Sequence, residues 1–129
     1  MLPASPAWSR LGEHLRETQI IGSIQSTLYW DQNTRMPCGG AVWRGEQLSL
    51  LATQLHARQS STHYAELVQA AREEWNQQTE TDDRGPRGRN LDLLEEDLRR
   101  QQSLDPALVA ALATAKASGY NQWQQARSA

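Results

Sequence analysis

The chain has 129 residues, a formal net charge of −2 and a hydrophobic fraction of 38% without any phenylalanine. This charge gives no electrostatic reason to expect nucleic acid or an anionic membrane as a partner. The single cysteine, Cys38, excludes an internal disulfide and suits a reducing compartment. No signal peptide is visible, and the longest aliphatic cluster is far shorter than the roughly 20 residues that span a bilayer. We therefore expect a cytoplasmic protein with no membrane or nucleic-acid partner.

Apolar residues recur at steps of three or four from about Pro6 to Thr34, apart from one skipped turn at Thr18, which predicts a first helix. The residues of this face are Trp8, Leu11, Leu15, Ile21, Ile24 and Leu28. Ser5 or Ser9 can cap the start of the helix. The helix must end before the segment 36–40, in which a proline and two glycines disfavour helical geometry.

Two further helices are predicted in the middle of the chain. The second covers about Ala41–Arg58, and small residues at the start of its face allow another helix to approach closely. The serines and threonine of segment 60–62 then offer a cap for a third helix, whose pattern is the most regular in the chain. The face of the third helix consists of Tyr64, Leu67, Val68, Ala71 and Trp75.

The segment Gln77–Arg89 has no apolar residue and predicts a loop. Asn90 can cap a fourth helix, and the pair Asp105-Pro106 is a strong start signal for a fifth helix that runs to the end of the chain. The apolar face of the fifth helix consists of Leu108, Val109, Leu112, Ala115, Gly119 and Trp123. No stretch alternates with the period of a strand. The sequence therefore predicts an all-α fold, with roughly five helices in an irregular antiparallel bundle and one helical domain over residues 1–129.

The segment from Leu28 to Ala41 resembles the N-terminal signature of the carboxypeptidase Taq family of zinc metallopeptidases. In that family Trp-Asp-Gln is followed by Met-Pro, then by Gly-Gly-Ala, and then by an arginine and a glutamine on the next helix. We call the matching residues of this chain the signature residues: Trp30, Asp31, Gln32, Met36, Pro37, Gly39, Gly40, Arg44 and Gln47. Weaker similarities follow in the family's order as far as Trp123-x-x-Ala126-Arg127, so the resemblance covers nearly the whole chain.

The resemblance implies a cytoplasmic zinc carboxypeptidase that removes single residues from the C-terminus of peptides. The implied fold is mostly helical, with a long groove, and is commonly a homodimer. Zinc is held in the family by a His-Glu-x-x-His helix and a later glutamate. The histidines of this chain are His14, His56 and His63, and none begins such a motif. We therefore expect the N-terminal region of such an enzyme, forming one wall of the groove, with no catalytic residue and no metal ligand of its own. Zinc is expected only in a full-length family member.

Two kinds of partner are compatible with this interpretation. One is the remainder of the carboxypeptidase, against which an inactive N-terminal region would pack. The alternative is a free-standing helical interaction or oligomerisation module derived from the enzyme, whose partner is a second copy in a homo-oligomer.

The polar candidates each have a functional and a structural interpretation. His14 and Glu17 lie one helical turn apart and could begin a metal site, but two ligands are too few, so we expect a polar surface role. The same role, or helix capping, is expected for His56 and His63. Asp31 and Gln32 could line or brace the substrate groove, or they could satisfy backbone groups where the first helix ends, which we favour.

The remaining candidates favour structural roles. The pair Gly39-Gly40 before a helix predicts a tight connection rather than an anion site, because no lysine follows. Arg44 and Gln47 could pair with Asp31 or with the neighbours of Glu46. Cys38 has no nearby histidine in the sequence to activate its thiol. We expect a solvated loop for Arg84, Arg87 and Arg89, and core or interface positions for Trp30, Trp43, Trp75 and Trp123.

Overall fold

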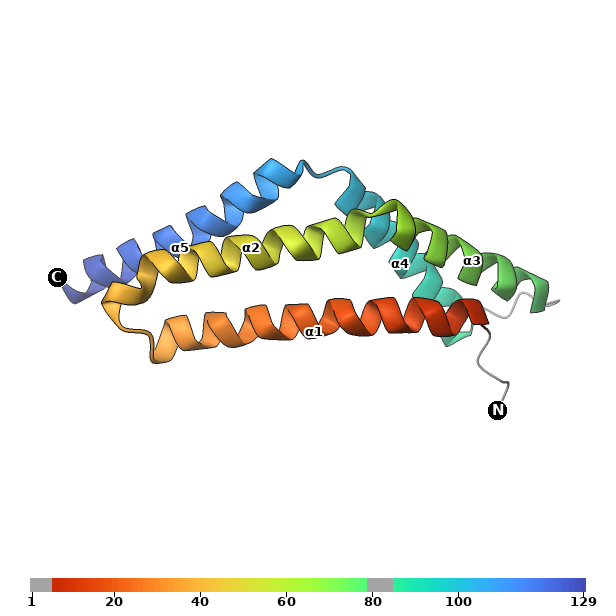
Figure 1. Cartoon of the computed structure of the whole chain (residues 1–129), viewed down its shortest axis with the longest axis horizontal. Coiled ribbons are helices and arrows are strands. Elements are labelled where there is room, and N and C mark those ends of the chain that lie inside the picture. Colours follow the sequence, from red (N-terminus) through yellow and green to blue (C-terminus); the bar gives the residue numbers. More distant parts are fainter. Residues whose placement is uncertain (1–5, 79–84) are drawn as a thin grey trace. The chain divides into compact units, whose positions relative to one another are not determined.

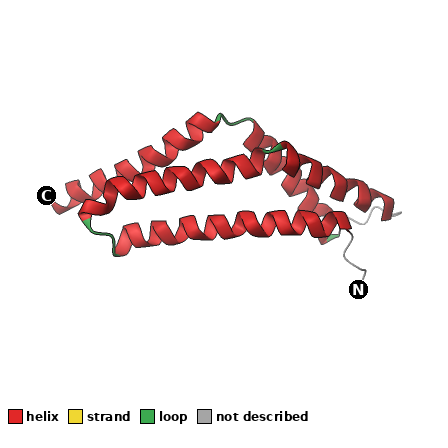
Figure 2. Cartoon of the chain, in the orientation of Figure 1, coloured by secondary structure: helices red, strands yellow, loops and turns green. Residues whose placement is uncertain are grey.

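The structure is a computed structural model that describes residues 6–78 and 85–129 (Figures 1 and 2). Within these residues the chain forms helices joined by short connections and no strand, which confirms the all-α prediction and the number of long helices. The elements are α1 (Pro6–Thr34), the 3-10 helix η1 (Cys38–Gly40), α2 (Ala41–Ser60), α3 (Thr62–Gln78), α4 (Pro86–Gln102) and α5 (Pro106–Ser128). None of the described helices combines the length and the apolar character needed to cross a lipid bilayer.

The chain divides into two compact units. Unit 1 contains the residues up to Thr18 and the segment Arg58–Ser103, and unit 2 contains Gln19–Ala57 and Leu104–Ala129. Both α1 and α2 therefore contribute residues to each unit. Unit 1 also holds α3 and α4, and unit 2 also holds η1 and α5.

Unit 1 has a hydrophobic core made by residues of α1, α3 and α4. The core residues are Leu11, Tyr64, Leu67, Val68, Ala71, Leu91 and Leu98, with Trp8, Leu15, Ala65, Trp75 and Leu94 packed around them. The helices α3 and α4 lie side by side (Figure 1) and are also joined by charge, because Arg72 contacts Asp92 at 2.7 Å and Glu95 at 2.8 Å.

Unit 2 packs in a different way, through small residues. Leu48 is fully buried on α2, while α5 buries Ala113 and Ala117. A Cβ atom built on Gly45 would lie 3.8 Å from the Cβ atom of Ala117, so the two helices approach closely at this point. Small side chains permit this approach because they leave little between the two backbones.

The large residues of the predicted apolar face of α5 are exposed and not buried. The exposed fractions of Leu108, Leu112 and Trp123 are 49%, 50% and 54%. Since an α-helix turns about 100° per residue, the buried residues 113 and 117 lie roughly opposite the exposed leucines. Close packing of alanines against α2 decides which side of α5 is buried, so hydrophobicity alone selects the wrong side.

The loop predicted for Gln77–Arg89 is too long at both ends. The helix α3 continues to Gln78, and α4 begins at Pro86 with Gly85 as the preceding cap residue. Asn90 is therefore inside α4 and is not its cap. Proline suits the first turn of a helix, where its missing N–H has no intrahelical acceptor to lose. The rest of the predicted loop, 79–84, lies outside the described residues.

Two of the predicted caps are present. The hydroxyl of Ser61 accepts a hydrogen bond from the backbone N–H of Tyr64 at 3.0 Å, and the carboxylate of Asp105 accepts one from the N–H of Ala107 at 2.8 Å. Ser9 lies inside α1, so a cap at this residue is wrong, and Ser5 is outside the described residues. The helix α2 ends at Ser60, slightly later than predicted.

The core of unit 1 makes a specific prediction for two leucines on α4. Leu91 has no exposed surface, whereas Leu93 is 46% exposed. We expect Leu91→Ala to lower the free energy of unfolding by about 2–5 kcal/mol, because it removes buried methyl groups and leaves a cavity. The matched control Leu93→Ala should change it by less than about 1 kcal/mol in the same urea titration. Equal losses for the two variants would contradict the described core.

Candidate functional site

Arg44 joins α1 to α2 within unit 2 and brings three of the signature residues together. Its Nη2 atom lies 2.6 Å from Oδ2 of Asp31, and its Nε donates to Oε1 of Gln47 at 3.0 Å. Its Nη1 donates to the backbone carbonyl of Leu28 at 2.6 Å. The side chain of Arg44 is only 12% exposed, so its charge is largely shielded from water. Arg44 therefore forms an ion pair with Asp31 and donates hydrogen bonds in three directions.

The turn after α1 is held by backbone hydrogen bonds. The carbonyl of Asp31 accepts from the N–H of Arg35 at 2.8 Å and from that of Met36 at 2.9 Å. Pro37 is extended, with φ −68° and ψ 151°, and its carbonyl accepts from the N–H of Gly40 at 2.9 Å. It is thus the backbone of Asp31, and not its side chain, that satisfies the donors at the end of the helix.

The two glycines of the signature differ in their surroundings. A Cβ atom on Gly40 would lie 3.2 Å from Cγ of Met36, closer than ordinary van der Waals contact. Nothing lies within 4 Å of a Cβ atom built on Gly39, and the structure does not explain a glycine there. Gly40 therefore allows the Met36 side chain to fold back over η1.

The remaining signature residues lie in contrasting environments. Trp30 is 61% exposed, whereas Gln32 is 3% exposed. The Nε2 atom of Gln32 is buried and has no hydrogen-bond partner among the described residues. A buried amide without a partner lowers stability by about 1–3 kcal/mol, so Gln32 is the one signature side chain whose place in this structure is unfavourable by itself.

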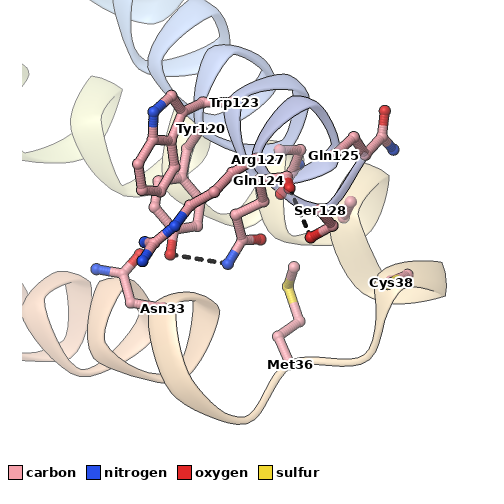
Figure 3. Close-up of a pocket in the computed structure, with 11 residues that line it drawn as sticks. Asn33, Met36, Cys38, Tyr120, Trp123, Gln124, Gln125, Arg127 and Ser128 are labelled. Atoms are coloured by element: carbon pink, nitrogen blue, oxygen red, sulfur yellow. Dashed lines mark hydrogen bonds between the residues drawn. The ribbon is translucent and has the colours of Figure 1, made fainter.

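Two grooves open on unit 2. The first, of about 670 Å³, lies between the α1–η1 connection, where Asn33, Met36 and Cys38 line it, and the last turns of α5 (Figure 3). The second, of about 720 Å³, lies between α2 and α5, with Val42 and Leu50 on its α2 side. The signature turn therefore forms one wall of the first groove.

The sequence patterns did not predict the α5 wall of the first groove. Tyr120, Gln124 and Arg127 belong to this wall. The nearest signal in the sequence is the pattern Trp123-x-x-Ala126-Arg127, which belongs to the family resemblance. A groove formed by segments about 90 residues apart cannot be recognised from local periodicity, because only tertiary packing brings them together.

The surface of unit 2 is rich in large apolar side chains. Ten of the eleven large hydrophobic residues that are exposed among the described residues belong to it. They are Ile20, Ile24, Trp30, Val42, Trp43, Leu50, Leu104, Leu108, Leu112 and Trp123. Three of the predicted tryptophan anchors are in this set, so a core position is wrong for them. Trp75 does pack against the core of unit 1.

Charge is scarce on the same unit. Of the 13 basic and 15 acidic residues of the chain, only seven lie in unit 2. They are Asp31, Arg35, Arg44, Glu46, Asp105, Lys116 and Arg127. Two of these, Asp31 and Arg44, already pair with each other. The exposed side of α5 is the most regular part of this surface, since Leu108 and Leu112 lie one helical turn apart and Trp123 follows on the same side about three turns later. We call these three residues the outer stripe of α5.

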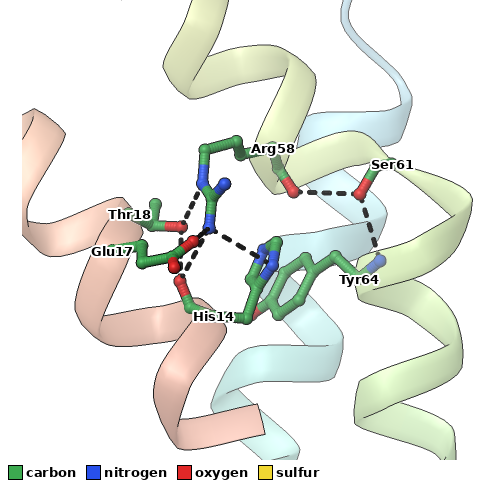
Figure 4. A network of polar contacts seen from close by, with 6 residues as sticks. All are labelled: His14, Glu17, Thr18, Arg58, Ser61 and Tyr64. Carbon is green, nitrogen blue, oxygen red and sulfur yellow. Dashed lines mark hydrogen bonds and ion pairs between the residues drawn. The ribbon is translucent and has the colours of Figure 1, made fainter. Parts of the chain in front are cut away.

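A polar network occupies the other unit, around Arg58 (Figure 4). The guanidinium group of Arg58 donates to Oε2 of Glu17 at 2.9 Å, to the hydroxyl of Thr18 at 3.1 Å and to the carbonyl of His14 at 3.2 Å. It also lies 3.4 Å from Nδ1 of His14, while the His14 ring stacks on Tyr64 with the centroids 4.9 Å apart. The surface role predicted for His14 is therefore wrong, because packing against α3 half-buries the ring.

Burial lowers the pKa of His14 below its ordinary value, and the positive charge of Arg58 lowers it further. The neutral ring accepts at Nδ1 from Arg58, which places the proton on Nε2. This Nε2 atom is buried and has no partner among the described residues. Burial likewise raises the pKa of Tyr64, and the charge of Asp97 adds to this effect. The network therefore favours a neutral imidazole and a neutral phenol.

The other predicted candidates are not brought together. His56 is 4% exposed, so the expected solvent-facing role is wrong. His63 is exposed, and its ring lies 5.9 Å from that of His14 in an edge-on arrangement. Arg87 and Arg89 belong to α4 and not to a loop; the guanidinium group of Arg87 lies 5.6 Å from the centroid of the Trp8 ring. Arg84 is outside the described residues.

No metal site is formed by the described residues. Within 6–78 and 85–129, no three histidine, cysteine or carboxylate side chains converge in a way that could hold a metal ion. Glu17, the partner suggested for His14, is engaged by Arg58. A catalytic zinc ion requires about three protein ligands, and the donors described here do not fit one.

Replacing the charged side chain of Arg44 should lower the stability of unit 2. We expect Arg44→Met to lower the free energy of unfolding by about 1–3 kcal/mol, because it leaves the carbonyl of Leu28 and the carboxylate of Asp31 without their partner. The control Arg35→Met removes an exposed arginine nearby and should change stability by no more than about 0.5 kcal/mol. Thermal unfolding of the two variants beside the parent chain measures the difference, and indistinguishable curves would count against the described contacts.

Stability should depend on pH through His14. Because its pKa in the folded chain lies below the ordinary value of 6.5, the unfolded chain binds a proton first as the pH falls. The contribution of a neutral His14 is thus fully present above this value and is lost as the pH drops through it. We expect urea unfolding between about pH 7.5 and pH 5 to show a shallower loss of stability for His14→Gln than for the parent chain. His63→Gln should keep the parent slope; an unchanged slope in His14→Gln would refute the assignment.

A comparison with protein-family models finds a match to the carboxypeptidase Taq (M32) metallopeptidase family over residues 10–129. No curated protein and no solved structure matches the chain in the corresponding searches. The matched residues include the Asp31–Arg44 contact, the turn through Gly40 and the whole of α5. The chain belongs to the carboxypeptidase Taq family of metallopeptidases.

Proposed function

We propose that the chain is the N-terminal helical region of a cytoplasmic zinc metallocarboxypeptidase and that it does not hydrolyse peptides by itself. Membership of the family supports the reaction class, which is the removal of residues from the C-terminus of peptides. The chemistry supports the inactivity. A zinc peptidase needs about three protein ligands, a base and an open position for water, and the described residues do not form such a set. Zinc would be held by another part of the enzyme.

The apolar surface of unit 2 is the observation that carries the proposal. Exposed patches of large hydrophobic residues mark protein interaction sites, and the central part of an interface is depleted in charge and enriched in aromatic residues. Unit 2 combines ten exposed large hydrophobic residues, three of them tryptophans, with only seven charged residues. We assign this surface to contact with the zinc-bearing part of the enzyme.

The signature residues then have a positioning role. Arg44 holds the end of α1 against α2 through Asp31 and Leu28, and the turn through Gly40 lies directly beyond this contact. A rigid turn of this kind suits one wall of a substrate groove, because a wall must keep its shape when peptide binds. Trp30, which is 61% exposed, is the large signature side chain available to the remainder of the enzyme.

Restoration of activity in trans tests the proposal. A carboxypeptidase of the same family, deleted of the residues that match 10–129, should release C-terminal amino acids slowly or not at all. Adding this chain should raise the zinc-dependent rate, whereas the chain alone should give no release above a chelator-treated blank. Zinc-dependent hydrolysis by the chain alone would overturn its inactivity, and a truncated enzyme indifferent to the added chain would overturn its role.

A variant pair connects the activity to the proposed surface. Leu108→Glu places a charge in the outer stripe of α5 and should reduce the restored rate by at least about tenfold, since a buried unpaired charge is strongly unfavourable. Leu93→Glu makes the same substitution at an exposed leucine of unit 1, outside this surface, and should have less than about a twofold effect. Equal rates with the two variants would exclude the outer stripe from the contact.

The second candidate is a free-standing oligomerisation module, and the outer stripe of α5 favours it. Leucines at turn-by-turn spacing on an exposed helix face also suit pairing with a second copy. Light scattering of the purified chain distinguishes the two functions. A concentration-independent homo-oligomer that Leu108→Glu converts to monomers would favour the module, while a monomer that binds the truncated enzyme favours the enzyme region.

A further inference from the structure

The groove between the α1–η1 connection and the last turns of α5 has an unusual set of lining side chains. Its eleven residues include two aromatic rings, four carboxamides and one cation, Arg127, but no carboxylate. Its volume of about 670 Å³ is within the range of roughly 300–1,000 Å³ found for ligand pockets. The nearest acid in the sequence, Asp31, is already neutralised by Arg44. The lining side chains therefore carry one positive charge and no negative charge.

The aromatic rings and the cation are held in place by one another. The guanidinium carbon of Arg127 lies 5.4 Å from the centroid of the Trp123 ring, a distance at which the ring face attracts a cation. Tyr120 lies beside Trp123 with a centroid distance of 6.0 Å, and its hydroxyl accepts from Nε2 of Gln124 at 2.9 Å. No carboxylate of the described residues pairs with Arg127. Figure 3 shows these side chains gathered opposite Asn33 and Met36.

We propose that this groove binds an extended peptide segment that carries an acidic side chain. A carboxamide both donates and accepts hydrogen bonds, so it can satisfy the N–H and C=O groups that an extended backbone presents in alternation. Asn33 supplies such a group from α1 and Asn121 from α5. Trp123 and Tyr120 offer apolar surface to alternate side chains, and Arg127 pairs with a carboxylate.

A phosphate-bearing ligand is less well matched to the same groove. A phosphate group carries up to two negative charges and is commonly held by several cations or by N–H groups at the start of a long helix. Here a single arginine is present, α5 contributes its last turns, and the start of α2 contributes only Ala41 to the lining. Neutral hydrogen-bonding groups predominate, which suits a peptide backbone with one carboxylate.

A binding assay with the intact chain tests this inference independently of any peptidase activity. The probe is a fluorescent peptide of alternating glutamate and leucine, capped at both ends so that it has no terminal carboxylate. Its partner probe has lysine in place of glutamate. At about 20 mM salt, where charges are weakly screened, we expect fluorescence anisotropy to show at least about fivefold tighter binding of the glutamate peptide. Equal affinities, or no binding of either peptide, would overturn the proposal.

Matched variants locate the binding. Arg127→Glu should lower the affinity for the glutamate peptide by at least about tenfold. Lys116→Glu makes the same charge change on the same helix outside the groove and should lower this affinity by less than about twofold. Trp123→Leu should weaken it more than Trp43→Leu, which removes an exposed tryptophan from α2. Circular dichroism confirms that each variant keeps its helices. Equal effects within either pair would refute the groove as the site.

Inorganic phosphate distinguishes a peptide site from a simple anion site. At a concentration of about 10 mM it should compete only weakly once ionic strength is matched with chloride, because the peptide backbone and side chains contribute most of the contact. Complete displacement by phosphate would show that the groove recognises an anion alone and would overturn the peptide assignment. All of these outcomes concern binding by the chain alone, so they stand whether or not the chain restores activity to a truncated enzyme.

Discussion

The contact between Arg44 and Asp31 is the constraint on which the architecture of unit 2 depends. One residue, Asp31, binds α2 through its carboxylate and closes the turn after α1 through its carbonyl. The end of α1 and the start of η1 are therefore held by the same few atoms. A largely buried arginine suits this task because its planar group donates in several fixed directions, which lysine cannot do. The walls of the first groove follow from this arrangement, since Asn33 and Met36 lie on either side of the turn.

The two units show how differently the same helical chain can be stabilised. Unit 1 combines an aliphatic and aromatic core with ion pairs between α3 and α4, so it resembles an ordinary small globular core. Unit 2 buries one leucine and small residues of α5, and places most of its large side chains in water. This division has a functional meaning in a metallopeptidase family member, because the unit that contains the signature residues is also the one with an apolar surface available to a partner.

Local patterns in the sequence predicted the helices well, because a spacing of three or four residues requires no tertiary information. They failed where packing decides. The burial of Ala113 in place of Leu112 depends on how closely α2 approaches, and the burial of His14 depends on Tyr64 from another helix. The start of α4 was misplaced because a proline was interpreted as part of a loop. The signature residues could be found from sequence, but the groove beside them could not, since its other wall is at the far end of the chain.

The burial of alanines and the exposure of leucines on α5 have a thermodynamic consequence. The heat capacity change of unfolding rises with the apolar area that folding removes from water, at about 0.45 cal/K/mol per Å². Unit 2 retains much of its apolar area in water, so its folding should contribute little to this quantity. If a partner covers the outer stripe, as proposed, association should show the large negative heat capacity change that marks hydrophobic burial. For this unit, we expect the heat capacity change of association to be larger than that of folding.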